Sequence, residues 1–168
     1  PLGSPVTSEP TFSQYVEVTK TATPPRFSNF ADGQSEEVTY TITITPKAQY
    51  QIEVLEMSDQ FEFLGEQGVF VRPDIQPLNP DNSHPIILDD FELEPGEKIQ
   101  TSTAATYTLT FSNLSTALAK DVLVRNAFRL KFKAYDAQGN LVQYREQATS
   151  DTNGSQGLAA VLVGSPRI

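Results

Sequence analysis

The chain has 168 residues, 38% of them hydrophobic and ten of them Phe, which is enough apolar material for the core of one domain. A formal net charge of -9 argues against nucleic acid as a partner, because an acidic surface repels the phosphate backbone. The sequence has no cysteine and a single histidine, His84, so disulfides, thiolate metal sites and His-pair metal sites are excluded.

The first four residues, Pro1–Ser4, are typical of the remnant left by a cleaved fusion tag, and we set them apart from the fold. We expect residues 5–168 to form a single domain that was cut from a longer natural protein. The sequence contains no apolar run long enough to cross a membrane, so we expect no membrane insertion by this segment.

Short runs rich in Thr, Val, Tyr and Phe alternate with Pro, Gly, Asn and Asp, which is typical of an all-β chain. The expected strands, in chain order, are Gln14–Ala22, Glu37–Thr45, Tyr50–Met57 with a continuation through Phe63, Ala105–Ser112, Asp121–Tyr135, Leu141–Arg145 and Leu158–Val163. Residues Ala137–Asn140 predict the turn of a hairpin. Strands of this spacing favour an immunoglobulin-like β-sandwich with Greek-key connections.

The segment from about residue 65 to residue 97 contains five prolines and predicts a loop-rich insertion. It contains two short apolar pieces, Val69–Val71 and Pro85–Leu88, and we expect it to carry one or two short strands. The polar residues of the insertion that could bind Ca²⁺, a glycan or a host protein are Asp74, Asp81, Asn82, Asp89 and Asp90. Asp81, Asp89 and Asp90 are weak candidate metal ligands, but they lack the regular spacing of a calcium loop. A solvated acidic loop is therefore favoured, and we expect no metal or cofactor.

Alternation places three polar residues on apolar faces, because residues two apart in a strand share a face. Asn126 falls within the apolar row Val122, Val124, Phe128, Leu130, Phe132 and Ala134. Lys20 falls in register with Val16, Val18 and Ala22. Asp59 is in phase with Leu55, Met57, Phe61 and Phe63 if its strand continues past Ser58. We therefore predict that Lys20, Asp59 and Asn126 all point into the core.

Burial would make these three side chains reactive toward one another. A buried ammonium is costly unless it pairs or loses its proton, and the neutral amine is a nucleophile. Burial also favours the protonated form of a carboxylic acid, so Asp59 could polarise the amide of Asn126 while Lys20 attacks it. Ammonia would leave and a Lys-Asn isopeptide bond would form. The alternative interpretation is a hydrogen-bonded asparagine and a lysine that reaches water near a strand end.

Five motifs are spread over most of the chain: Val18–Ala22, Gly33 with the strand Val38–Thr45, the apolar run Val54–Asp59, the Leu-x-Pro-Gly-Glu turn Leu93–Glu97 with the strand Tyr107–Phe111, and Val124–Ala127. Together they resemble the conserved repeat domain of bacterial and archaeal surface proteins. More broadly, they resemble the collagen-adhesin-type isopeptide domains of Gram-positive adhesins and pilins.

The resemblance implies that Lys20 and Asn126 form the isopeptide bond and that Asp59 is the catalytic acid. The chain departs from the family pattern in its long insertion, and because Gln60-Phe61 follows Asp59 where the family has a Thr-Leu-Pro turn. The alternatives for the acid are therefore Glu53, Glu56 and Glu62.

The resemblance also implies a structural stalk or adhesin module on a bacterial cell surface or cell wall, without an external substrate. We expect a monomer whose partners are the neighbouring modules of the same protein and a host or cell-surface protein or glycan. The alternative is a ligand-binding module that uses the acidic insertion and has no isopeptide bond. An enzyme is disfavoured because the sequence fixes no pair of carboxylates at a defined separation.

Overall fold

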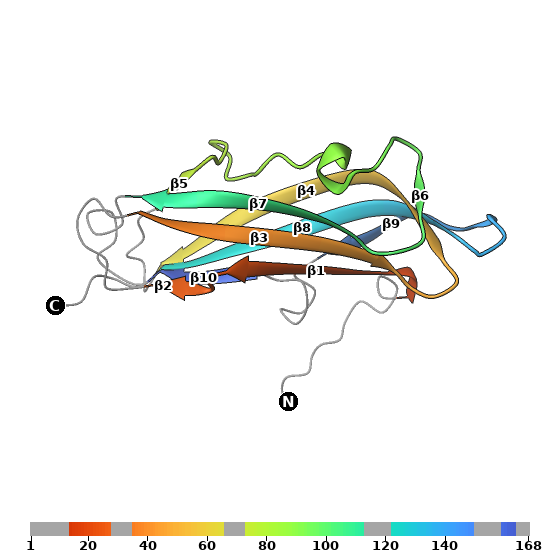
Figure 1. The fold of residues 1–168 in the computed structure, drawn as a ribbon, viewed down its shortest axis with the longest axis horizontal. Coiled ribbons are helices and arrows are strands. Elements are labelled where there is room, and N and C mark those ends of the chain that lie inside the picture. Colours follow the sequence, from red (N-terminus) through yellow and green to blue (C-terminus); the bar gives the residue numbers. More distant parts are fainter. Residues whose placement is uncertain (1–13, 28–34, 66–72, 113–121, 150–158, 164–168) are drawn as a thin grey trace, which may run out of the picture.

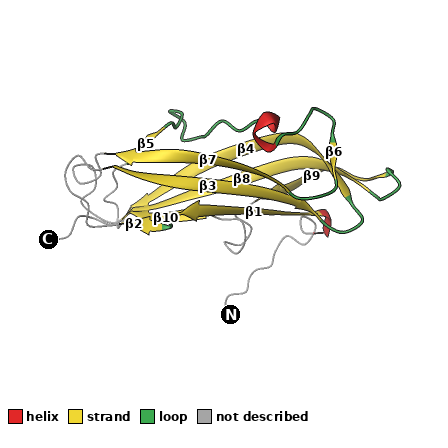
Figure 2. Ribbon diagram, in the orientation of Figure 1, coloured by secondary structure: helices red, strands yellow, loops and turns green. Residues whose placement is uncertain are grey.

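The computed structural model describes residues 14–27, 35–65, 73–112, 122–149 and 159–163. Their strands form two sheets that pack face to face as a β-sandwich, so the prediction of an all-β sandwich is confirmed (Figure 1). Strands make up most of the described chain, and the short helical turns lie outside the two sheets (Figure 2). The segments Pro1–Ser4, Gly33 and Val69–Val71, which the sequence analysis singled out, lie outside the described residues.

The first sheet has the strand order β1-β3-β7-β5 and consists of β1 (Val16–Thr23), β3 (Ser35–Pro46), β7 (Thr103–Ser112) and β5 (Asp74–Gln76). Strand β3 pairs antiparallel with β1 on one side and with β7 on the other. Its alternate residues Val38, Tyr40, Ile42 and Ile44 are fully buried. The threonines between them face outward, which is the pattern of a strand with one solvated face.

The second sheet has the strand order β2-β10-β8-β4-β6 and consists of β2 (Arg26–Phe27), β10 (Ala159–Val163), β8 (Val122–Tyr135), β4 (Gln51–Gly65) and β6 (Lys98–Ile99), with β9 (Leu141–Thr149) also paired to β8. Strand β4 pairs antiparallel along the whole of one side of β8. On the other side, β10 pairs with the first part of β8 and β9 with the second. Strand β8 is therefore enclosed along most of its length.

One detail of the predicted parity of β4 is wrong. The register between β4 and β8 shifts between Val54 and Glu56, which is the signature of a β-bulge. The bulge turns Leu55 outward, where it is 37% exposed, although the sequence pattern placed it in phase with Asp59. Beyond the bulge, Asp59 and Phe61 are buried as predicted.

The described part of the insertion contains a short strand, but not at the predicted residues Pro85–Leu88. Pro85–Leu88 is not a strand; it leads into η2, a short 3-10 helix at Leu88–Phe91. Prolines cannot donate to a strand ladder, so a proline-led apolar run is a poor strand. The described strand within the insertion is β5 (Asp74–Gln76), which pairs with β7.

The predicted hairpin between β8 and β9 is confirmed. Asp136 N donates to Asn140 O at 2.8 Å, and the Asp136 carboxylate accepts from the backbone N–H groups of Gln138 and Asn140. Gly139 has a φ of +90°, a conformation in which a residue without a Cβ is unstrained. The turn residues thus fix where β9 starts.

Two apolar clusters fill the space between the sheets. One gathers around Ile42, Ile52 and Phe132, and the other around Tyr40, Phe61 and Phe111. Tyr107 packs against both clusters. Among the described residues, the buried polar side chains are Lys20, Asp59 and Asn126, and they lie beside this tyrosine.

Candidate functional site

Three strands contribute the buried polar side chains. Lys20 comes from β1 in the first sheet, whereas Asp59 on β4 and Asn126 on β8 come from the second sheet. Their relative exposures are 3%, 1% and 0%, so all three are shut away from water, as predicted. In the register of β4 with β8, Asp59 faces Phe128 and Phe61 faces Asn126, which places Asp59 and Asn126 diagonally on one inward face.

The amine of Lys20 crosses the space between the sheets to reach the carboxylate of Asp59. Lys20 Nζ donates to Asp59 Oδ1 at 2.8 Å and to Oδ2 at 3.0 Å, with both side chains fully buried. Breaking such a pair by removing one partner leaves an uncompensated charge in the core. The lysine therefore does not reach water at the strand end, which the alternative interpretation required.

Tyr107 on β7 is the functional residue that the parity argument did not select. Its hydroxyl accepts from Lys20 Nζ at 2.8 Å, donates to Asp59 Oδ2 at 2.6 Å and lies 3.4 Å from Asn126 Oδ1. The signal was present in the sequence, since Tyr107 shares the inward parity of the buried Ala105 and Leu109. A buried tyrosine hydroxyl needs a polar partner, and such a partner was available in the predicted trio.

The amide of Asn126 is held in one orientation. Its Nδ2 donates to the backbone carbonyl of Gln60 on the neighbouring strand β4 at 3.0 Å. Because the nitrogen is directed toward β4, the carbonyl oxygen Oδ1 is left facing the Tyr107 hydroxyl. The Tyr107 hydroxyl thus lies between the amide of Asn126 and the Lys20–Asp59 pair.

Aromatic rings surround the polar groups. Lys20 Nζ lies 4.8 Å from the ring centroid of Tyr107, 5.2 Å from that of Tyr40 and 5.9 Å from that of Phe61. On its outer side, Tyr107 stacks on the half-buried ring of His84 with centroids 3.8 Å apart. Low-polarity walls of this kind exclude water and strengthen every electrostatic interaction inside them.

The environment shifts two groups in the direction that amine chemistry needs. Burial lowers the pKa of Lys20 from 10.5 to about 8, although the charge and hydrogen bond of Asp59 act in the opposite direction. Burial, with the negative charge of Asp59, raises the pKa of Tyr107 well above its usual value. The amine is therefore easier to deprotonate than an ordinary lysine, and the phenol stays protonated.

The alternative acids of β4 point away from this site. Tyr135 donates to Glu53 Oε1 at 2.7 Å. The exposed side chains of Glu56 and Glu62 lie 3.4 Å from Lys131 Nζ and 3.6 Å from Arg125 Nη1, respectively. Within the residues that the structure describes, Asp59 is the carboxyl group brought to Lys20 and Asn126.

The acidic residues of the insertion are engaged in local structure. Asp81 accepts from Ser83 N and Oγ, Asp90 caps the backbone N–H of Ile87, and Asp74 accepts from Ser112. Asp89 lies in η2 beside Asp90. Across the described segments, no group of three or more His, Cys, Asp or Glu side chains is arranged to hold a metal ion.

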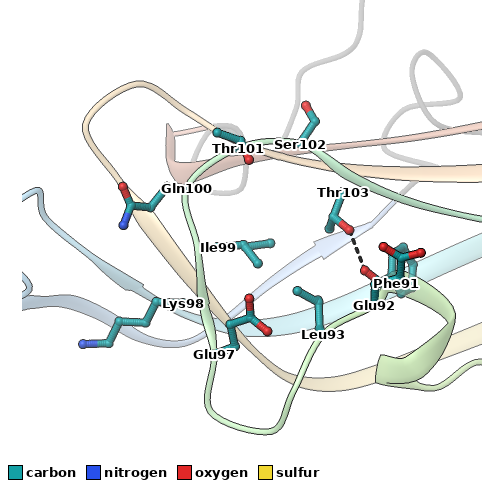
Figure 3. A pocket seen from close by; sticks show the side chains of 10 residues that line it. All are labelled: Phe91, Glu92, Leu93, Glu97, Lys98, Ile99, Gln100, Thr101, Ser102 and Thr103. Atoms are coloured by element: carbon teal, nitrogen blue, oxygen red, sulfur yellow. Dashed lines mark hydrogen bonds between the residues drawn. The ribbon is translucent and has the colours of Figure 1, made fainter.

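A surface hollow of about 360 Å³ lies at the far end of the insertion, where the chain runs from η2 through β6 into β7 (Figure 3). Its polar lining includes Glu92, Glu97 and Lys98, and Thr103 Oγ1 donates to Phe91 O at 2.8 Å across it. Neither the buried trio nor Tyr107 lines this hollow. It is therefore separate from the site described above.

No protein-family model and no curated protein sequence matches this chain. In the described part of the chain, no helix is long and apolar enough to cross a membrane.

Proposed function

We propose that this chain is an immunoglobulin-like structural module of a bacterial cell-surface stalk or adhesin, stabilised by an isopeptide bond that it forms between its own Lys20 and Asn126. Asp59 promotes the bond as the acid. The module acts on no external substrate, and its partners are the neighbouring modules of the same protein and the surface molecules to which the protein adheres.

One observation carries this proposal: an amine, a carboxyl group and a carboxamide from three strands share a single buried point. As a purely structural device this arrangement is costly, because the free energy needed to desolvate an ion pair can exceed the Coulombic energy gained by pairing. As a reaction centre the same burial is useful, since it promotes the neutral amine and holds it against the amide.

The strand order supports the immunoglobulin-like part of the proposal. With β2, β6 and β9 set aside, the other seven strands of the described residues are lettered A to G along the chain, and β1, β3, β7 and β5 take the places of A, B, E and D. Likewise β4, β8 and β10 take those of C, F and G. This division into ABED and CFG sheets is the arrangement of constant-type immunoglobulin domains. The motif resemblance favours a stalk module over a ligand-binding module that uses the acidic insertion, and the carboxylates of that insertion are engaged in local hydrogen bonds.

The reaction balances without an external reagent. The Lys20 ammonium passes one proton to the Asp59 carboxylate, and the neutral amine attacks the side-chain carbonyl carbon of Asn126. The bond from that carbon to Nδ2 breaks, and Nδ2 leaves as ammonia with a second proton from the lysine nitrogen. The products are a Lys20–Asn126 amide, a protonated Asp59 and one ammonia molecule.

Intact-mass measurement of the full chain tests the proposal. We expect the wild-type mass to be lower than the sequence mass by one ammonia, and Lys20→Ala and Asn126→Ala to show their full sequence masses. Peptide mapping should recover a branched peptide that joins Lys20 to Asn126. A wild-type chain that retains its full mass would contradict the crosslink.

The same measurement identifies the acid. Asp59→Asn should retain ammonia, because it removes the carboxyl group that Lys20 contacts. Glu56→Gln makes the same chemical change on the outer face of β4 and should crosslink like the wild type. Loss of the bond in Glu56→Gln, with bond formation in Asp59→Asn, would assign the role of the acid to the outer face.

A further inference from the structure

Tyr107 joins the acid to the amide in this site. Its hydroxyl is within hydrogen-bonding distance of Asp59 Oδ2 at 2.6 Å and of Asn126 Oδ1 at 3.4 Å. In the part of the chain that the structure describes, the other hydrogen bond of the Asn126 side chain runs from Nδ2 to Gln60 O. The carboxyl group of Asp59 therefore reaches the amide oxygen through the tyrosine hydroxyl.

We propose that Tyr107 is a catalytic residue of the crosslinking reaction, which relays a proton from Asp59 to Asn126 Oδ1 while Lys20 attacks. This inference rests on the isopeptide bond proposed above and assigns the contact with the amide oxygen to the phenol. Asp59 is the source of the proton, and Tyr107 donates a hydrogen bond to Oδ1 as negative charge develops on that atom.

A hydroxyl group is suited to this position because it can donate and accept at once. In the ion-paired state it accepts from Lys20 and donates to Asp59. When the lysine proton moves to Asp59, the carboxyl group becomes the donor, and the hydroxyl hydrogen turns toward Asn126 Oδ1. A phenol with a raised pKa keeps its own proton over the whole neutral range, so Tyr107 always has a proton to pass on.

The ring of Tyr107 is fixed on both faces. It stacks on Tyr40 with centroids 5.4 Å apart and on His84 with centroids 3.8 Å apart. Tyr40 and Tyr107 are also directly opposite each other in the register of β3 with β7. The position of the hydroxyl is therefore set by the first sheet and by the insertion, which is the preorganisation that transition-state stabilisation requires.

The proton balance of the relay is closed. As the lysine nitrogen bonds to the carbonyl carbon, the carbonyl π electrons move to Oδ1, which takes the hydroxyl proton of Tyr107. Tyr107 in turn takes the proton held by Asp59. When the tetrahedral intermediate collapses and ammonia leaves, the proton on Oδ1 returns through Tyr107 to Asp59. Tyr107 ends the reaction as it began.

Timed crosslinking of the full chain tests the relay. The chain is made by cell-free translation, quenched in acid at intervals and weighed intact. We expect Tyr107→Phe to lose ammonia roughly 100-fold more slowly than the wild type, the usual effect of removing a general acid. The ring contacts with Tyr40 and His84 are retained in this variant, and circular dichroism checks its fold.

Tyr135→Phe is the matched control. It also removes a tyrosine hydroxyl bonded to a β4 carboxylate, that of Glu53, but it does so outside the site. This control should crosslink at the wild-type rate. Equal slowing of both variants, or no slowing of Tyr107→Phe, would overturn the relay while leaving the crosslink in place.

Fluorinated tyrosines at position 107 separate chemistry from packing. They keep the ring and the hydroxyl but change the acidity of the hydroxyl, so the crosslinking rate should change across the series. A rate independent of hydroxyl acidity would overturn the relay, even if Tyr107→Phe failed to fold. A wild-type chain that never loses ammonia would overturn the crosslink and the relay together.

Discussion

At the scale of single residues, the site depends on the difference in burial between Lys20 and the lysines of the surface. Its amine is buried against Asp59, and burial lowers its pKa to about 8. Lys131 also lies near a carboxylate, that of Glu56, but both side chains are largely exposed, and such pairs contribute little. Desolvation thus distinguishes the buried Lys20 from a surface lysine.

This pKa predicts a pH dependence of stability in a chain that retains the free amine. In Asn126→Ala, the folded state releases the Lys20 proton near pH 8, whereas the unfolded state keeps it up to about pH 10.5. The unfolded state then binds more protons between these values, so the unfolding free energy rises with pH by about 1 kcal/mol per pH unit. Urea denaturation of Asn126→Ala at pH 8, 9 and 10 measures this rise.

The window ends near pH 10, because tyrosines ionise in the unfolded state above about that value. Burial raises the pKa of Tyr40 and Tyr107 in the folded state, which reverses the slope at higher pH. The control adds Lys20→Met and Asp59→Asn to Asn126→Ala, which removes both buried charges. If the unfolding free energy of Asn126→Ala rises with pH no more steeply than that of this control, the lowered pKa of Lys20 is contradicted.

At the scale of elements, a segment of the insertion, residues 82–87, covers the site. Phe61 N donates to Asn82 O at 2.8 Å and His84 N donates to Asp59 O at 3.0 Å, so the segment pairs with the edge of β4. An isolated bridge between Gln60 and Ser83 lies between these two bonds. The segment thereby places the ring of His84 over Tyr107. The proline-rich stretch is thus partly a cover for the buried trio.

The cover predicts how accessible Lys20 is. In the Asn126→Ala background, we expect Lys20 to be acetylated far more slowly than the exposed Lys98, as measured by peptide mapping after timed labelling. Adding His84→Ala should raise the labelling rate of Lys20 several-fold, because it removes the ring stacked on Tyr107.

Ile87→Ala provides the matched control for this experiment. Ile87 belongs to the same segment but is 58% exposed, so its removal should leave the labelling of Lys20 unchanged. Equal labelling of Lys20 with and without His84 would show that the histidine does not shield the amine.

At the scale of the whole molecule, the proposed bond joins the two sheets. Lys20 lies in β1 of the first sheet and Asn126 in β8 of the second, and β10 pairs with β8 directly beside Asn126. The bond would close a loop of about a hundred residues, which stabilises a chain by roughly 4 to 5 kcal/mol in the entropic account of crosslinks. With this bond, a chain without cysteine would gain what disulfides provide elsewhere.

Two measurements on the whole molecule follow from this loop. Asn126→Ala should unfold with a free energy lower by about 4 kcal/mol or more than that of the wild type. Under force applied at the chain ends, both proteins should extend as they unfold. The wild type should extend less than Asn126→Ala by the length of about a hundred residues, at roughly 3.5 Å for each residue. Equal extensions would show that residues between Lys20 and Asn126 remain within the stretched chain.

The fold class and the burial of Lys20, Asp59 and Asn126 could be predicted from the sequence. Alternation with a period of two is a local property, and it can be read wherever a strand runs without interruption. It failed at Leu55, because a bulge shifts the phase without a clear local signal. The prediction at Pro85–Leu88 rested on a short apolar run and not on alternation, and it failed because a run that begins with proline is a poor strand.

Which side chains contact one another could not be predicted from the sequence and depends on the packing of the sheets. Sequence patterns left four carboxylates of β4 as candidates for the acid, and the structure brought Asp59 to Lys20 while Glu53, Glu56 and Glu62 faced outward. It also brought Tyr107 and His84 to the site from β7 and from the insertion. These contacts join residues far apart in the chain, and their geometry depends on how two sheets pack, which no local pattern encodes.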